Sequence, residues 1–76
     1  MSTPSQRAKQ AFEEGAALLG SGRPDKALPC FRRAIKLFPG IATLHLYCGV
    51  ALYETKQFQE AVRCYYRAIE LDSGMG

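Results

Sequence analysis

The chain has 76 residues with a net charge of +3, and 47% of its residues are hydrophobic. This length allows one small domain with a thin core, and this hydrophobic content argues against disorder. No apolar run approaches the roughly 18 residues of a membrane span, and the first ten residues lack the apolar centre of a signal peptide. We therefore expect no membrane insertion. Three cysteines without close CxxC spacing favour reduced thiols and a cytoplasmic, intracellular setting over a disulfide framework.

Charge is distributed unevenly along the chain. Residues 1–40 hold seven basic and three acidic side chains, whereas residues 41–76 hold three basic and four acidic ones. A basic half can attract nucleic acid or an acidic partner. A nucleic-acid reader interleaves basic and aromatic side chains on one surface, but these basic residues are spread over two expected helices. We interpret them as a solvated outer face and expect no nucleic-acid partner.

The first expected helix opens with a capping box. The Thr3 hydroxyl can accept a hydrogen bond from the backbone of Gln6, the Gln6 side chain can reach back, and Pro4 supplies the fixed φ of a first helical residue. The helical pattern then continues to about Leu19, where Gly20-Ser21-Gly22 ends it. One face is small and a second is larger and more apolar: Ala8, Ala11, Gly15 and Leu18 form the first, and Phe12, Ala16 and Leu19 the second.

The second expected helix begins with Pro24 or Asp25 and ends at Pro39-Gly40. A proline well inside a helix costs ~3 kcal/mol, whereas one in the first turn removes no hydrogen bond. We therefore place the start near Asp25, which leaves Pro29 in the first turn. The inward face carries Ala27, Leu28, Phe31, Ala34, Ile35 and Phe38.

Two further helices are expected, over about residues 41–55 and 58–71, and Ser73-Gly74 closes the last one. The connections between all four helices are short, so sequential helices should be antiparallel neighbours. The predicted fold class is all-α.

The chain also repeats itself. The stretch ALPCFRRAIKLFP at residues 27–39 returns as AVRCYYRAIELDS at residues 61–73, a shift of 34 residues, and Gly15 returns as Gly49. Self-similarity at a fixed period of this length is the signature of a helical repeat array.

These residues resemble the tetratricopeptide repeat family. Its pattern, W-x2-L-G-x2-Y followed by A-x3-F and then P, falls on Ala11, Glu14, Gly15, Leu18, Ala27, Phe31 and Pro39, and again on His45, Cys48, Gly49, Leu52, Ala61, Tyr65 and Ser73. Both copies depart from the pattern at the tryptophan and leucine positions, and the second copy also lacks the final proline. The resemblance implies a cap segment at residues 1–7, repeats at 8–41 and 42–75, and two helix-turn-helix units in a short right-handed α-solenoid.

Such a resemblance implies a protein-binding function. In these arrays the first helix of each repeat lines a concave groove that binds a peptide or helix of another protein. The matching positions are Lys9, Phe12, Glu13, Ala16 and Leu19, then Thr43, Leu46, Tyr47, Val50, Tyr53 and Glu54. This mostly apolar face favours a hydrophobic peptide or an amphipathic helix, with Tyr47 and Tyr53 as anchors. Alternatively, these residues are core that a neighbouring copy or further chain covers.

One function of the family is not expected here. Members that hold the acidic C-terminal tails of heat-shock chaperones use a lysine and asparagines that point into the groove. The matching positions are Phe12 for the lysine, and Ala16 and Tyr47 for asparagines, and none of these side chains can hold a carboxylate.

Catalysis and metal binding are not expected either. His45 and Cys48, with Cys30 and Cys64, make a conceivable zinc set, but the last two occupy equivalent places in separate repeats. They are expected to pack as small apolar groups. No carboxylate is placed to orient His45 as a base for Cys48. We therefore predict no enzyme, no metal and no cofactor.

The last helix has an apolar outer side, made by Val62, Tyr66 and Ile69. Exposed apolar patches of this kind mark interfaces. The alternative function is therefore a self-associating scaffold unit, or a fragment of a longer repeat protein. Self-association could be a two-fold dimer through this helix, or head-to-tail stacking helped by the charge asymmetry.

Overall fold

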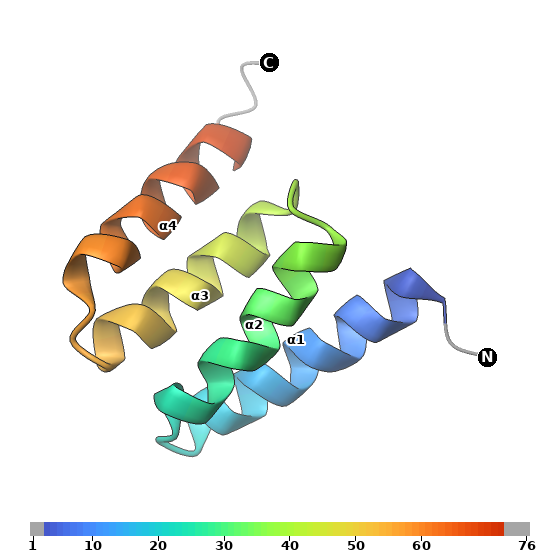
Figure 1. Cartoon of the computed structure of the whole chain (residues 1–76), viewed down its shortest axis with the longest axis horizontal. Coiled ribbons are helices and arrows are strands. Elements are labelled where there is room, and N and C mark those ends of the chain that lie inside the picture. Colours follow the sequence, from blue (N-terminus) through green and yellow to red (C-terminus); the bar gives the residue numbers. More distant parts are fainter. Residues whose placement is uncertain (1–2, 73–76) are drawn as a thin grey trace.

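The computed structural model describes residues 3–72, which form four helices: α1 Pro4–Gly20, α2 Pro24–Leu37, α3 Ala42–Glu54 and α4 Phe58–Asp72 (Figure 1). Between residues 3 and 72 there is no strand. The predicted all-α class and the four helices are confirmed. The predicted closure of the last helix by Ser73-Gly74 lies outside the described residues.

The capping box at the start of α1 is present as predicted. The Thr3 hydroxyl oxygen accepts from the backbone N–H of Gln6 at 3.2 Å, and the Thr3 N–H donates to Oε1 of Gln6 at 3.0 Å. Two N–H groups that the helix cannot satisfy internally are thereby paired. The cap fixes where α1 begins, and with it the position of Lys9 and Phe12.

The two repeats turn in the same way between their helices. After α1, Gly22 adopts φ 78°, and the N–H of Arg23 donates to the carbonyl of Leu18 at 2.9 Å. After α3, Lys56 occupies the equivalent position with φ 65°, and the same type of hydrogen bond closes that turn. This left-handed residue and its backward bond form the Schellman motif that ends helices.

The position expected for Pro29 is wrong. Helix α2 begins at Pro24, which stands at its N-terminus with the φ that a first helical residue needs, so Pro29 lies inside the helix and not in its first turn. Pro29 has no N–H to donate to the carbonyl of Asp25, one turn earlier. Both residues are exposed, so water can reach that carbonyl.

The helices pair in chain order. α1 packs along α2 and α3 packs along α4, while α2 and α3 join the two hairpins and α1 touches α3 only slightly. In Figure 1, α3 accordingly lies between α2 and α4. The result is a flat body with extents of 35 × 34 × 16 Å. No helix between residues 3 and 72 is long and apolar enough to cross a membrane.

The core forms two neighbouring clusters. The larger one joins both hairpins around the fully buried side chains of Phe31 and Leu52. The smaller one joins α1 and α2 to the start of α3 through Ala8, Ala11, Ala34 and Leu44. Small residues at the crossing points let the helices approach, and the few large rings fill the space between them.

Candidate binding groove

Three aromatic rings, one from each of the first three helices, form the floor between α1 and α3. The Phe12 ring meets the Tyr47 ring edge-on with centroids 4.9 Å apart, and the Phe31 ring lies 6.1 Å and 5.7 Å from them. Phe31 is buried, whereas Phe12 and Tyr47 are half-buried. Phe12 and Tyr47 therefore tie α1 to α3 and still leave part of their surface exposed.

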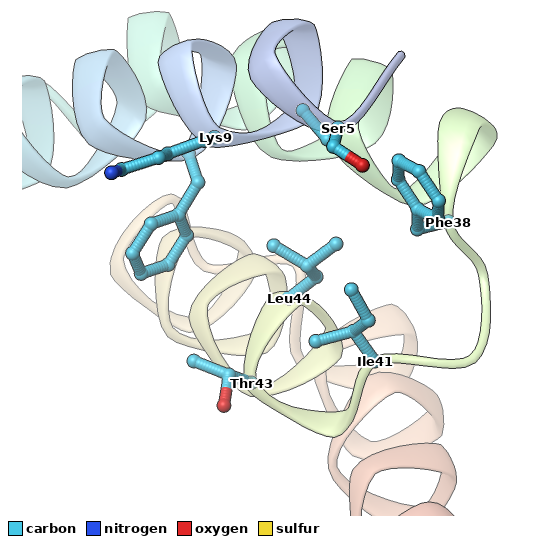
Figure 2. A pocket seen from close by; sticks show the side chains of 8 residues that line it. Ser5, Lys9, Phe38, Ile41, Thr43 and Leu44 are labelled. Atoms are coloured by element: carbon cyan, nitrogen blue, oxygen red, sulfur yellow. The ribbon is translucent and has the colours of Figure 1, made fainter. Parts of the chain in front are cut away.

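An apolar hollow of about 290 Å³ opens beside this floor, between α1 and the start of α3. In Figure 2, Phe38, Ile41 and Leu44 stand around it, and Lys9 lies at the end away from Phe38 with its amino group pointing outward. The complete lining is Ser5, Ala8, Lys9, Phe12, Phe38, Ile41, Thr43 and Leu44. A single cation at the rim of an apolar hollow favours an apolar group with a carboxylate beside it.

The hollow contains only part of the predicted groove. Lys9, Phe12 and Thr43 line it. The other predicted residues lie elsewhere along α1 and α3: Glu13, Leu46, Tyr53 and Glu54 are exposed, and Ala16, Leu19, Tyr47 and Val50 are half-buried.

The predicted anchor Tyr53 stacks edge-on with Phe58 of α4 at 5.2 Å, away from the hollow. It remains 56% exposed. Tyr53 is therefore held at the end of the α3–α4 hairpin, outside the hollow near Lys9.

A second hollow of about 380 Å³ lies between α3 and α4. Its lining repeats that of the first: Ala42, Thr43, Leu46 and Asp72 stand 34 residues after Ala8, Lys9, Phe12 and Phe38. These four positions therefore border a hollow in both repeats, while the rest of the second lining, Tyr65, Ala68 and Ile69, comes from α4.

Sequence reasoning missed Ser5, Ala8, Phe38, Ile41 and Leu44 as groove residues. Three of them lie at or near the connection between α2 and α3, which the pattern marks only as a stop. Hydrophobic periodicity assigns Phe38 and Ala8 to packing faces and gives no signal that space remains beside them. The available signal was the 34-residue shift itself, which pairs Ala8 with Ala42 and Phe12 with Leu46.

His45 has a structural contact. It is 8% exposed, and its Nε2 lies 2.7 Å from the carbonyl oxygen of Pro39. Because a carbonyl only accepts, Nε2 carries the proton and donates to it. The ring thus holds the α2–α3 connection against α3, which helps place Phe38 and Ile41 around the hollow.

Cys30 and Cys48 are protonated packing groups. Burial, and then the neighbouring Cys64, raise the pKa of Cys48 to about 12. Burial, and then the charge of Glu14, also raise the pKa of Cys30. A thiol must lose its proton to act as a nucleophile or a metal ligand. Among residues 3–72, no group of three or more His, Cys, Asp or Glu side chains is arranged to hold a metal ion.

Comparison with known proteins agrees with the architecture. The tetratricopeptide repeat profile matches residues 12–75, so the chain belongs to the tetratricopeptide repeat family. Repeats of this family are general protein-interaction modules and are typically not catalytic. No curated protein matches the sequence.

Proposed function

We propose that this chain is a binding module that takes a hydrophobic peptide or amphipathic helix of another protein in the groove between α1 and α3. The observation that carries the proposal is the apolar hollow walled by Phe12, Phe38, Ile41 and Leu44. At about 290 Å³ it lies at the lower limit of the ~300–1,000 Å³ typical of small-molecule sites. One large apolar side chain of a longer ligand suits it better than a cofactor.

Lys9 adds a chemical preference to the shape. It is the one charged residue in the lining, and it is exposed at the rim. It also lies in the basic half of the chain, which attracts acidic segments over a longer range. The partner segment we propose therefore has a large aliphatic or aromatic side chain for the hollow and an acidic residue next to it for Lys9.

Selection from a random peptide library on the wild-type protein tests this preference. Enriched peptides should share a large apolar residue flanked by Asp or Glu. Their affinity, measured by fluorescence anisotropy, should fall about ten-fold or more for Ile41→Glu, because the substitution places a charge in the apolar wall. Lys9→Glu should weaken the acidic peptides and spare variants with the acid replaced by glutamine.

Val62→Glu is the matched control. Val62 is 48% exposed and Ile41 is 44% exposed, so the two substitutions make similar demands on folding. Val62 lies on α4, outside the hollow. Equal loss of binding in both variants, or enrichment of peptides without a large apolar residue, would contradict the proposal.

We propose an intracellular setting for this function, because the described cysteines are free and two of them are buried. We assign it no catalytic step. The second candidate function, self-association, is favoured by a separate observation on α4 and is developed next.

A further inference from the structure

One side of α4 carries an exposed apolar stripe, whose two ends border α3: Phe58 contacts Tyr53, and Ile69 lines the hollow between α3 and α4. The stripe residues are Phe58, Val62, Tyr66 and Ile69, with exposures of 50%, 48%, 66% and 63%. Their spacing of four, four and three residues places them on one side of a helix. Four of the seven large apolar side chains exposed among residues 3–72 are on this stripe.

The equivalent residues of the first repeat indicate how part of this stripe can pack. Val62 and Ile69 stand 34 residues after Leu28 and Ile35 of α2. Leu28 is 8% exposed because α2 packs against α3, whereas Val62 is 48% exposed. At these two positions α4 therefore repeats a face that packs against another helix in the first repeat, whereas Phe58 and Tyr66 stand where α2 has Pro24 and Arg32.

Head-to-tail stacking of copies does not supply that helix. In such a stack, α1 of one copy would take the place that α3 takes on α2. The residues of α1 equivalent to Leu44 and Cys48 are Gln10 and Glu14. Cys48 is 3% exposed, so stacking would move the Glu14 carboxylate into a buried position that faces the apolar stripe. Burying an unpaired charge is strongly unfavourable.

We propose that the stripe pairs with the same stripe of a second copy, with the two α4 helices antiparallel about a two-fold axis. The axis passes near Tyr66, so Val62 lies level with the partner's Ile69. An isologous contact of this kind places each apolar group against an apolar group. The two hairpin bodies lie on opposite sides of the axis.

The charges beside the stripe are self-complementary in this arrangement. Arg63 and Glu70 lie on the same flank of the stripe, on its solvent side. In an antiparallel pair, equal flanks meet, so Arg63 comes beside the partner's Glu70, offset by two residues or ~3 Å along the axis. The two-fold axis forms this ion pair twice in each dimer. In the single chain the Glu70 carboxylate lies 3.6 Å from the guanidinium of Arg67, and its side chain is 69% exposed.

The stripe sets the strength of the dimer. Helix α4 has 15 residues and is therefore ~22 Å long. One helix pair of this length covers less than the ~800 Å² per partner of a standard interface. The dimer should therefore be reversible, with a dissociation constant on the order of micromolar or weaker.

Sedimentation velocity over a concentration series tests the proposed dimer when the charges of Arg63 and Glu70 are reversed, singly and together. The wild type should pass from monomer to dimer. Arg63→Glu alone and Glu70→Arg alone should each weaken the dimer roughly ten-fold, because each creates two like-charge contacts. An equimolar mixture of the two variants, and the double variant, should return to the wild-type midpoint.

Circular dichroism melting of each variant separates dimer loss from unfolding, and both substituted side chains are exposed. Ile69→Glu should abolish the dimer, while the matched Ile41→Glu should leave it intact. A wild-type monomer at all concentrations would overturn the proposal and leave the stripe to a helix of another protein. Oligomers that grow without limit would overturn the proposal as well. So would a mixture of the Arg63→Glu and Glu70→Arg variants that dimerises no more tightly than either variant alone.

Discussion

Gly15 of α1 lies directly against the ring of Phe31 in α2: a Cβ atom at Gly15 would come within 2.7 Å of Cε1 of Phe31. The second repeat has the same relationship, with a Cβ at Gly49 only 2.8 Å from Cε1 of Tyr65. Each hairpin therefore closes around one aromatic ring that needs a glycine opposite it. In the first hairpin this ring also supports Phe12 and Tyr47 in the groove floor.

Gly15→Ala should destabilise the fold by about 1–2 kcal/mol in urea denaturation, because the buried ring has no space to retreat. Gly20→Ala is the control in the same helix, where a Cβ meets no described atom within 4 Å. There the substitution should be neutral or slightly stabilising, since alanine favours a helix over glycine. Equal effects at the two positions would show that α1 and α2 are not this close.

Replacing Lys56 should stabilise the fold. Its φ of 65° lies in the left-handed region, which costs a lysine energy and a glycine almost none. Lys56→Gly should raise stability by about 1 kcal/mol, and Gly22→Ala at the equivalent turn should lower it by about as much. Thermal unfolding of both variants checks the pair, and a loss for Lys56→Gly would refute the turn geometry.

Replacing Pro29 should also stabilise the protein. Pro29→Ala restores the N–H that can donate to the Asp25 carbonyl and should add about 1–3 kcal/mol. Pro24→Ala at the first position of the same helix should bring no such gain, because no intrahelical bond is missing there. Denaturation midpoints that rank the two variants the other way would move the start of α2 to a later residue.

Stability should fall in alkaline solution. The Cys48 pKa is raised from 9.0 to about 12, so the folded state keeps a proton that the unfolded state releases. The corresponding stability is complete below about pH 9 and is lost as pH rises towards 12, with a slope of up to about 1.4 kcal/mol per pH unit. Cys48→Ala lowers the starting stability through a cavity but should flatten this slope. An unchanged slope would assign the effect to other groups, such as Tyr65, whose pKa is also raised by burial.

The fold could be predicted from the sequence because the residues that indicate each helix hairpin are close together in the chain and occur twice. The 34-residue shift repeats the glycine and the aromatic ring of each hairpin, so each copy supports the interpretation of the other. The expected place of Pro29 in the first turn of α2 is wrong. Only one of the two prolines can stand at the first helical position, and the other, five residues later, then lies beyond the first turn. Pro24 takes that position, and the helix continues through Pro29 because its exposed side can be hydrated.

The groove was only partly predictable. Helical spacing places Lys9 and Phe12 on one face, but it does not show that Phe38 and Ile41 fold back across the end of α1 and α3. That arrangement depends on the α2–α3 connection, which His45 fixes through the carbonyl of Pro39. A contact between a ring nitrogen and a backbone oxygen six residues away leaves no periodic trace in a sequence.

Nuclear magnetic resonance titration of the isotope-labelled protein with a library-selected peptide tests the central claim most directly. Backbone amide shifts should concentrate at the hollow, on Ala8, Lys9, Phe12, Ile41 and Thr43, and should disappear in Ile41→Glu. Shifts confined to α4 around Val62 and Ile69, or spread over the outer side of α2, would contradict a binding groove between α1 and α3.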